Sequence, residues 1–142
     1  MKPSSADALP ESAAAVLAAA GVGAGSRVCC ALSGGVDSVV LFELLRQLQP
    51  RFGFGLLAAH VDHGLSPNAA AWARACSERC AAAGVPLTVF RVDVDRAHAD
   101  GLEAAARLAR HAALAQVDCG WLAFGHHQDD QAETLLFRLL RG

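Results

Sequence analysis

The stretch Leu32-Ser33-Gly34-Gly35-Val36-Asp37-Ser38 lies between two apolar runs, one at residues 28–31 and one that begins at Val39. This arrangement predicts a turn that connects a strand to a helix. The paired glycines allow the backbone to approach a ligand, and the start of the helix directs N–H groups and a positive dipole end toward it. The sequence therefore predicts an anion-binding loop at residues 33–38.

Three polar side chains complete this loop. Ser33 and Ser38 add hydroxyl donors, whereas Asp37 places a carboxylate where a bare phosphate would be repelled. A Mg²⁺ ion between carboxylate and phosphate removes that conflict, so a nucleotide bound with its metal fits best. The spacing differs from the P-loop of kinases and GTPases, because Gly-x-x-x-x-Gly-Lys is absent and Lys2 is the chain's one lysine.

The hexapeptide Ser-Gly-Gly-Val-Asp-Ser resembles the pyrophosphate-binding loop of the PP-loop ATP pyrophosphatase superfamily. Its members cleave ATP between the α- and β-phosphates, so the resemblance implies that ATP binds here. An ordinary glycine-rich turn between a strand and a helix is the alternative interpretation.

Composition limits the classes of protein to consider. The chain has 142 residues, of which 54% are hydrophobic, so one packed domain is expected. Its net charge of −2 gives no strong positive field for nucleic acid. No apolar run reaches transmembrane length, and acidic residues precede the alanine-rich run at 13–20, which argues against a secretory signal. These features predict a cytoplasmic protein.

The cysteines lie inside apolar runs, and no two of them have the Cys-x-x-Cys spacing. This argues against a metal cluster. Buried, reduced thiols are expected, as in a cytosolic protein. The set comprises Cys29, Cys30, Cys76, Cys80 and Cys119.

Hydrophobic patterns alternate between strand and helix along the chain. Strands are expected at residues 27–32, 54–62, 85–94 and 120–124, and helices at 13–20, 36–48, 66–83, 100–117 and from 129 onward. Pro50 is expected to stop the second helix, Ser66 to cap the third, and Asp100 with Glu103 to form a capping box. Trp72 is expected in the buried stripe of its helix.

Successive strand–helix units predict an α/β fold, a doubly wound parallel sheet with helices on both faces. We expect the strand order 3-2-1-4, with a fifth strand absent from this chain. The anion loop and two further motifs then meet at the carboxyl edge of the sheet, where such folds bind ligands.

Three further segments match a narrower family. They are His60-Val-Asp-His-Gly-Leu-Ser-Pro-Asn68, Gly101-Leu-Glu-Ala-Ala-Ala-Arg107 and His126-His-Gln-Asp-Asp-Gln-Ala-Glu-Thr134. With the loop, they resemble the catalytic domain of bacterial tRNA(Ile)-lysidine synthetases in the same order. The resemblance implies a carbon–nitrogen ligase that uses ATP. It adenylates the C2 carbonyl oxygen of the wobble cytidine in tRNA(Ile) with a CAU anticodon, and free L-lysine then displaces AMP.

The resemblance also implies roles for particular residues. The catalytic group would be Asp37, Glu103, Arg107 and Asp130, with Asp37 and Asp130 sharing Mg²⁺. The nucleotide would contact Ser33, Gly34, Gly35, Val36, Asp37, Ser38, His60, His63 and His126. Spacing alone favours a surface ion pair for Glu103 and Arg107, and the histidines could simply be hydrogen-bonded residues at strand ends.

Other functions stay open. The cluster at 126–130, with Asp62 and His63, could bind two metals as in a phosphohydrolase. Another AMP-forming PP-loop ligase or tRNA-modifying enzyme, or a non-catalytic nucleotide-binding module, would also have the loop. Members of the resembled family continue past the Arg-Gly at 141–142. We therefore expect residues 1–142 to be the ATP-binding catalytic domain, truncated at its C-terminus and without the domains that bind tRNA. A homodimer is also an open expectation.

Overall fold

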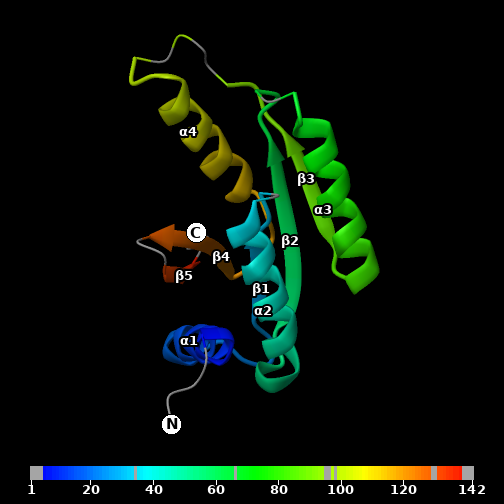
Figure 1. The fold of residues 1–142 in the computed structure, drawn as a ribbon, viewed down its shortest axis with the longest axis vertical. Helices are drawn as coiled ribbons and strands as arrows, with labels where there is room; N and C mark the ends of the chain where they lie inside the picture. The colour runs from blue at the N-terminus through cyan, green and yellow to red at the C-terminus, as the bar shows by residue number, and fades with distance from the viewer. Residues whose placement is uncertain are drawn as a thin grey trace.

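The computed structural model describes residues 5–33, 35–65, 67–94, 97, 99–128 and 131–138, with the backbone alone for 5–9, 125–128 and 131–138. Helices and strands alternate along most of this part of the chain (Figure 1). Their order is α1 (Ser5–Ala20), β1 (Arg27–Ala31), α2 (Val36–Phe52), β2 (Gly55–Asp62), α3 (Ala69–Ala83), β3 (Leu87–Arg91), α4 (Leu102–Leu114), β4 (Trp121–Gln128) and β5 (Gln131–Arg138).

The sheet has the strand order β3-β2-β1-β4-β5. Strands β3, β2, β1 and β4 are parallel to one another, which confirms the predicted order 3-2-1-4. The switch point lies where β1 is flanked by β2 and β4. The carboxyl end of β1, where the anion loop begins, is therefore the expected ligand-binding position of the fold.

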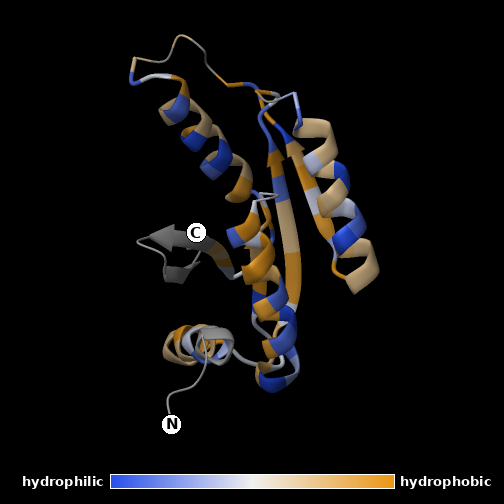
Figure 2. Cartoon of the chain, in the orientation of Figure 1, coloured by the Kyte–Doolittle hydropathy of each residue, from blue (hydrophilic) through white to orange (hydrophobic). Residues whose placement is uncertain are grey.

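Two hydrophobic layers cover the two faces of the sheet. Neighbouring residues of β1 alternate between them, because successive side chains of a strand point to opposite faces. Cys30 packs in the layer formed with α1, α2 and α3, and Cys29 packs in the layer formed with the end of α4. Figure 2 shows the apolar strands between helices whose surfaces are mixed. The doubly wound arrangement is confirmed.

The end of the chain differs from the prediction. A helix was expected from residue 129, whereas residues 131–138 form β5, antiparallel to β4, with Gln128 opposite Gln131. The short connection allows direct antiparallel pairing, and the edge of β4 away from β1 has backbone groups that need partners. Pairing with β5 satisfies those groups along β4, so the sheet gains a fifth strand within this chain.

Helix α2 is also longer than predicted. It passes through Pro50 and ends at Phe52, where Gly53 adopts a left-handed conformation with φ 79° and donates its N–H to the Gln49 carbonyl at 2.7 Å. Proline lacks one N–H donor, but in the last turn the loss concerns a single helical hydrogen bond. The left-handed glycine ends the helix in its place.

Helices α3 and α4 start later than predicted. Asn68, rather than Ser66, precedes α3, and Ser66 lies outside the described residues. Gly101, with φ 96°, occupies the N-cap position of α4, so the capping box expected from Asp100 is wrong. A left-handed backbone favours glycine at this position.

Candidate functional site

The anion loop between β1 and α2 is held by its own serines. Ser38 is 4% exposed, and its hydroxyl donates to the Gly35 carbonyl at 2.9 Å. The same oxygen accepts the N–H and the hydroxyl of Ser33, each at 3.1 Å. Ser33 Oγ in turn accepts the N–H of Gly35 at 3.3 Å. The two hydroxyls therefore fix the shape of the loop before any ligand arrives.

The first turn of α2 follows directly from this loop and is exposed at Val36. Gly35 is the N-cap residue and has no side-chain cap, and Val36 is 79% exposed. The first turn of a helix has N–H groups without helical acceptors, and its dipole favours an anion. The backbone of Gly35 is ordinary, with φ −77°, and an added Cβ would be 3.5 Å from Ser33 Oγ. Neither the backbone conformation nor the neighbouring atoms therefore require glycine at position 35. We infer that glycine is present because a ligand approaches the backbone closely there.

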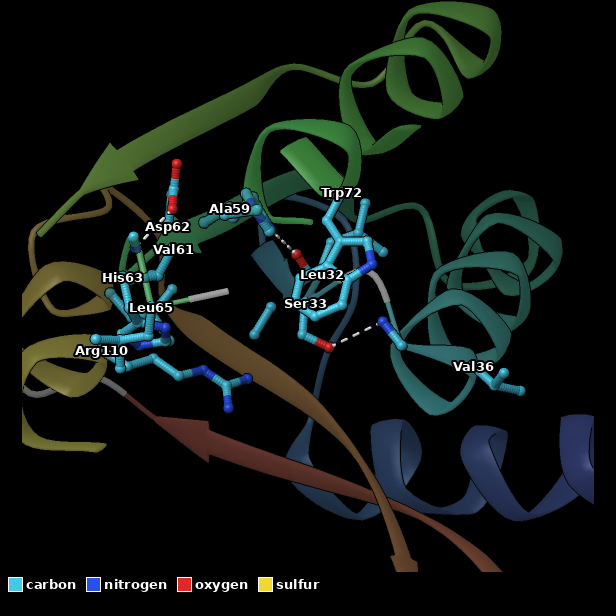
Figure 3. Close-up of a pocket in the computed structure, with 16 residues that line it drawn as sticks. Leu32, Ser33, Val36, Ala59, Val61, Asp62, His63, Leu65, Trp72 and Arg110 are labelled. Carbon is cyan, nitrogen blue, oxygen red and sulfur yellow. Dashed lines mark hydrogen bonds between the residues drawn. The ribbon is translucent and has the colours of Figure 1, made fainter. Parts of the chain in front are cut away.

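The loop opens onto a cavity of about 520 Å³ at the carboxyl edge of the sheet (Figure 3). The ends of β1 and β2 form its mostly apolar floor, and the first turns of α2 and α3, together with α4, form its walls. It is lined by Ala31, Leu32, Ser33, Gly35, Val36, Ala59, His60, Val61, Asp62, His63, Gly64, Leu65, Ala69, Trp72, Arg110 and Leu114.

His60 joins β2 to the base of the anion loop. It is 3% exposed, and its Nδ1 lies 2.8 Å from the Leu32 carbonyl oxygen. Since a carbonyl only accepts, this contact assigns a proton to Nδ1, and in the neutral ring Nε2 is then the acceptor. The Cys76 thiol lies 3.7 Å from both the same carbonyl and His60 Nδ1. His60 thus supports the loop and borders the cavity.

The opposite end of the cavity contains Asp62, His63 and Arg110 (Figure 3). Asp62 Oδ1 accepts the N–H of Gly64 at 2.8 Å, which shapes the turn after β2. His63 Nε2 is buried and has no hydrogen-bond partner among the described residues. A buried polar atom of this kind is uncommon and indicates a missing partner.

Arg110 brings a positive charge into the cavity from α4. Its guanidinium lies 5.4 Å from the centre of the Phe124 ring, an arrangement that orients it. Burial lowers the pKa of Arg110, because removing the charged group from water is unfavourable. An anionic ligand would offset that effect. Sequence reasoning missed Arg110, although it lies one helical turn after Arg107, which was selected.

The structure brings together several of the predicted site residues. Those that line the cavity are Ser33, Gly35, Val36, His60 and His63. Asp37 is half-buried in the first turn of α2, where the anion-loop segment 33–38 enters the helix. Glu103 and Arg107 are exposed on α4 and are not among the lining residues. His126 belongs to β4 in backbone terms, and Gly34 and Asp130 lie outside the described residues.

Trp72 was predicted to be buried, and this is wrong. It is 45% exposed and lines the cavity, whereas Cys76 and Cys80 of the same predicted stripe are buried. Trp72 is near the start of α3, where the helix borders the cavity instead of the sheet. Its indole therefore faces open space that a ligand can share.

All five cysteines are buried, as predicted. The pKa of the Cys29 thiol is raised, first by its hydrogen bond with Cys119 and then by burial. Burial also raises the pKa of Cys30 and Cys76, and that of Cys80 to about 11. Thiolates are the reactive form, so these side chains are inert in the folded protein.

We predict that native protein reacts slowly with a thiol reagent at pH 8 and that unfolded, reduced protein shows five free thiols. Because the pKa of Cys80 rises from 9.0 to about 11, its contribution to stability is complete below pH 9.0 and is lost as the pH rises toward 11. Reagent titration and denaturant unfolding across this range measure both effects. Fast labelling of native protein, stoichiometric iron or zinc, or fewer than five thiols would contradict the prediction.

Metal ligands do not converge in the described part of the chain. No group of three His, Cys, Asp or Glu side chains among those residues could hold an ion. The acidic pair at 129–130, on which the phosphohydrolase alternative depends, lies outside them. Among the described helices, none is both long and apolar enough to cross a membrane.

The doubly wound sheet, with its glycine-containing anion loop after β1, defines a nucleotide-binding α/β domain. The chain belongs to the PP-loop domain family, whose model matches residues 10–142. A solved structure with a similar fold is the U34-tRNA thiolase NcsA from Methanococcus maripaludis with its [4Fe-4S] cluster. It has a TM-score of 0.67 and 23% identity, over 77% of this chain and 40% of that one.

Proteins named tRNA(Ile)-lysidine synthase are much more similar in sequence. That of Azoarcus sp. (strain BH72) is 63% identical over 129 residues, which cover 91% of this chain and 29% of the relative. That of Aromatoleum aromaticum is 62% identical over 127 residues, covering 89% and 30%. The chain therefore spans less than a third of the length of these curated relatives.

Proposed function

We propose that this chain is the ATP-binding catalytic domain of an enzyme that joins lysine to the wobble cytidine of tRNA(Ile) with a CAU anticodon. ATP would adenylate the C2 carbonyl oxygen of the base, releasing pyrophosphate. The lysine ε-amine would then displace AMP. The observation that carries the proposal is the anion loop, which its own serines tie together and which lines a cavity of about 520 Å³.

The loop suits the pyrophosphate end of ATP. The Ser33 and Ser38 hydroxyls hydrogen-bond to each other and within the loop. The backbone N–H groups at the start of α2 would therefore provide much of the anion binding, with Gly34 and Gly35 allowing close approach. Preformed donors need little rearrangement as the pyrophosphate leaves.

Asp37 fits a Mg²⁺ site at this loop. Mg²⁺ is typically bound by one or two carboxylates together with substrate phosphates, so a single protein carboxylate near the pyrophosphate suffices. We propose Asp130 as the second carboxylate. When bound, the ion would reduce the negative charge that repels a nucleophile from ATP.

The remainder of the nucleotide would lie across the apolar floor formed by β1 and β2. His60 Nε2 can accept a hydrogen bond there, and His63 Nε2 lacks a partner. Arg110, which lines the same cavity, would stabilise negative charge on the α-phosphate. We also propose that His126 contacts the nucleotide.

Glu103 and Arg107 would act where the tRNA approaches. Both are exposed on α4, and Arg107 precedes the cavity residue Arg110 by one helical turn. An exposed guanidinium there can contact the bound base or its phosphate. We also propose a cytoplasmic location and a homodimer for the complete protein.

We predict that the complete protein, incubated with ATP, labelled lysine and the minor isoleucine tRNA bearing CAU, transfers lysine to that tRNA. AMP and pyrophosphate should appear in equal amounts. Isoleucine tRNA with another anticodon is the control. Pyrophosphate release that requires a different nucleophile would indicate another AMP-forming ligase. ATP binding without pyrophosphate release would contradict catalysis itself.

A further inference from the structure

Strand β3 forms one edge of the sheet, and among the described strands its neighbour is β2 alone (Figure 1). The strand reads Leu-Thr-Val-Phe-Arg, so it contains neither the proline nor the lysine that commonly protects an edge strand. Its central residue, Val89, is 38% exposed although it is apolar. The described part of the chain therefore leaves the outer side of β3 open to a further strand.

The pairing of β3 with β2 fixes the direction of its backbone groups. The Ala58 N–H donates to the Pro86 carbonyl oxygen at 2.9 Å. The Val92 N–H donates to the Asp62 carbonyl oxygen at 3.0 Å. Backbone groups alternate in direction along a strand, so the even-numbered residues of this segment face β2. The N–H and C=O groups of the odd-numbered residues from 87 to 93 therefore face away from the sheet.

The side chains alternate in the same way and continue to do so past the end of β3. Phe90 and Val92 pack against the hydrophobic layer on the α4 side of the sheet. Arg91 and Asp93 are exposed, whereas Val94 is again partly buried. The segment 90–94 therefore has one apolar face and one charged face, as expected for an extended chain.

Arg91 and Asp93 carry opposite charges two residues apart on the same face. Neither forms an ion pair within the described part of the chain. When two copies of one strand pair antiparallel about a twofold axis, each contact between two different positions occurs twice. An axis at position 92 places Arg91 of each copy opposite Asp93 of the other, so that two ion pairs form across the strands.

The other registers are less favourable. Outward-facing backbone groups of the two copies must meet, so the axis passes through a residue and not between two residues. An axis at 91 places two arginines opposite each other, and an axis at 93 places two aspartates opposite each other. Like charges in these positions are destabilising. An axis at 90 places both charges opposite apolar side chains, those of Val89 and Leu87.

The axis at position 92 also matches the apolar face. It places the two Val92 side chains opposite each other and Phe90 of each copy opposite Val94 of the other. These residues form one apolar row on the α4 side of both copies, while the ion pairs lie on the other side. Charge and apolar pattern therefore select the same register.

We propose that a second copy of this chain pairs with β3 about a twofold axis at Val92, which extends the sheet across both copies. The inference specifies the surface of the homodimer proposed above and is independent of the reaction that the protein catalyses. Strands of the two copies run in opposite directions. The two nucleotide cavities therefore open toward opposite ends of the shared sheet.

Charge reversal in the complete protein tests the register by sedimentation. We expect the wild type to be a dimer. Arg91→Asp or Asp93→Arg should raise the dissociation constant by about 10- to 100-fold, because each replaces two attractive cross-strand pairs by two repulsive ones. An equal mixture of the two variants should form heterodimers, since every aspartate then meets an arginine. The control is Arg51→Asp, at an exposed pair with Glu11 of 3.4 Å, which should leave the dimer unchanged.

A cysteine at position 92 tests the position of the axis. The two Val92 Cα atoms would lie about 4.5 Å apart, as in a non-hydrogen-bonded pair, which is within the range of a disulfide. With oxidised glutathione, Val92→Cys should give a cross-linked dimer. Val94→Cys, which would lie opposite Phe90, should not. All five natural cysteines are buried and should not compete.

A monomeric wild type, a dimer that neither charge reversal weakens, or a mixture of the two variants that stays monomeric would overturn the interface. So would Val94→Cys cross-linking as readily as Val92→Cys. Melting temperatures confirm that the variants fold, as expected for exposed side chains. Lysine transfer by a monomer would overturn the interface and leave the proposed activity intact. The predicted dimer without lysine transfer would do the reverse.

Discussion

Asp37→Asn should slow pyrophosphate release by the complete protein by at least about 100-fold, because a catalytic metal supplies several kcal/mol of transition-state stabilisation. Asp37 lies in the first turn of α2, beside the proposed phosphate site. Its carboxylate would repel a bare phosphate but would hold a cation against it. Asparagine keeps the shape of the side chain and removes this charge.

Glu43→Gln is the matched control for Asp37→Asn. Glu43 lies on the same helix, paired with Arg46 at 3.1 Å and Arg79 at 3.5 Å on a partly exposed surface. Such pairs contribute little, so turnover should be unchanged. Removing an acidic residue from the first helical turn should itself cost only about 0.3–1 kcal/mol of stability. Wild-type turnover by Asp37→Asn, at any Mg²⁺ concentration, would refute the role of Asp37.

The sequence predicted the parallel part of the fold because its signals agree at several levels. Apolar strands alternate with amphipathic helices, and right-handed crossovers leave few possible orders. The alternation of Cys29 and Cys30 between the two layers follows from the two-residue period of a strand. The anion loop was located for a similar reason, since its glycines and serines come directly between a strand and a helix.

The end of the chain shows where local pattern fails. Leu135 and Leu136, with the acidic residues before them, fit a helix, but the backbone of residues 131–138 pairs with β4. The spacing of apolar side chains carries no information about whether the edge of a sheet lacks backbone hydrogen-bond partners. It therefore could not predict that this segment would pair with β4. The prediction that Trp72 is buried failed for a different reason. Helical spacing predicts which face of α3 a residue lies on, but it does not predict where along the helix that face stops packing on the sheet.

Arg107 and Arg110 show the same limit within the site. They are three residues apart on α4, so both lie near one face of the helix and spacing cannot distinguish them. The family resemblance selected Arg107. Which arginine reaches the cavity depends on how α4 packs against β4. The centre of the Phe124 ring, on β4, lies 5.4 Å from the Arg110 guanidinium carbon. Such a tertiary position is not encoded in the periodicity of one helix.

Replacing each arginine by alanine should therefore separate two functions. Arg110→Ala should reduce pyrophosphate release by about 100- to 1000-fold, the usual effect of removing one preorganised donor from developing charge. ATP binding should weaken as well, since Arg110 lines the cavity proposed for the nucleotide. Arg107→Ala should leave ATP binding near wild type and slow lysine transfer to tRNA, because Arg107 is exposed outside that cavity.

Arg110→Lys distinguishes a specific guanidinium from a simple positive charge. Lysine cannot form the planar, two-pronged contact or keep the same stacking on Phe124, so it should restore only part of the activity. Nucleotide binding by calorimetry, pyrophosphate release and lysine transfer should be measured for all three variants, with melting temperatures to confirm folding. If Arg107→Ala lost ATP binding while Arg110→Ala retained it, α4 would present the opposite arginine to the nucleotide, and the proposed use of this cavity would be wrong.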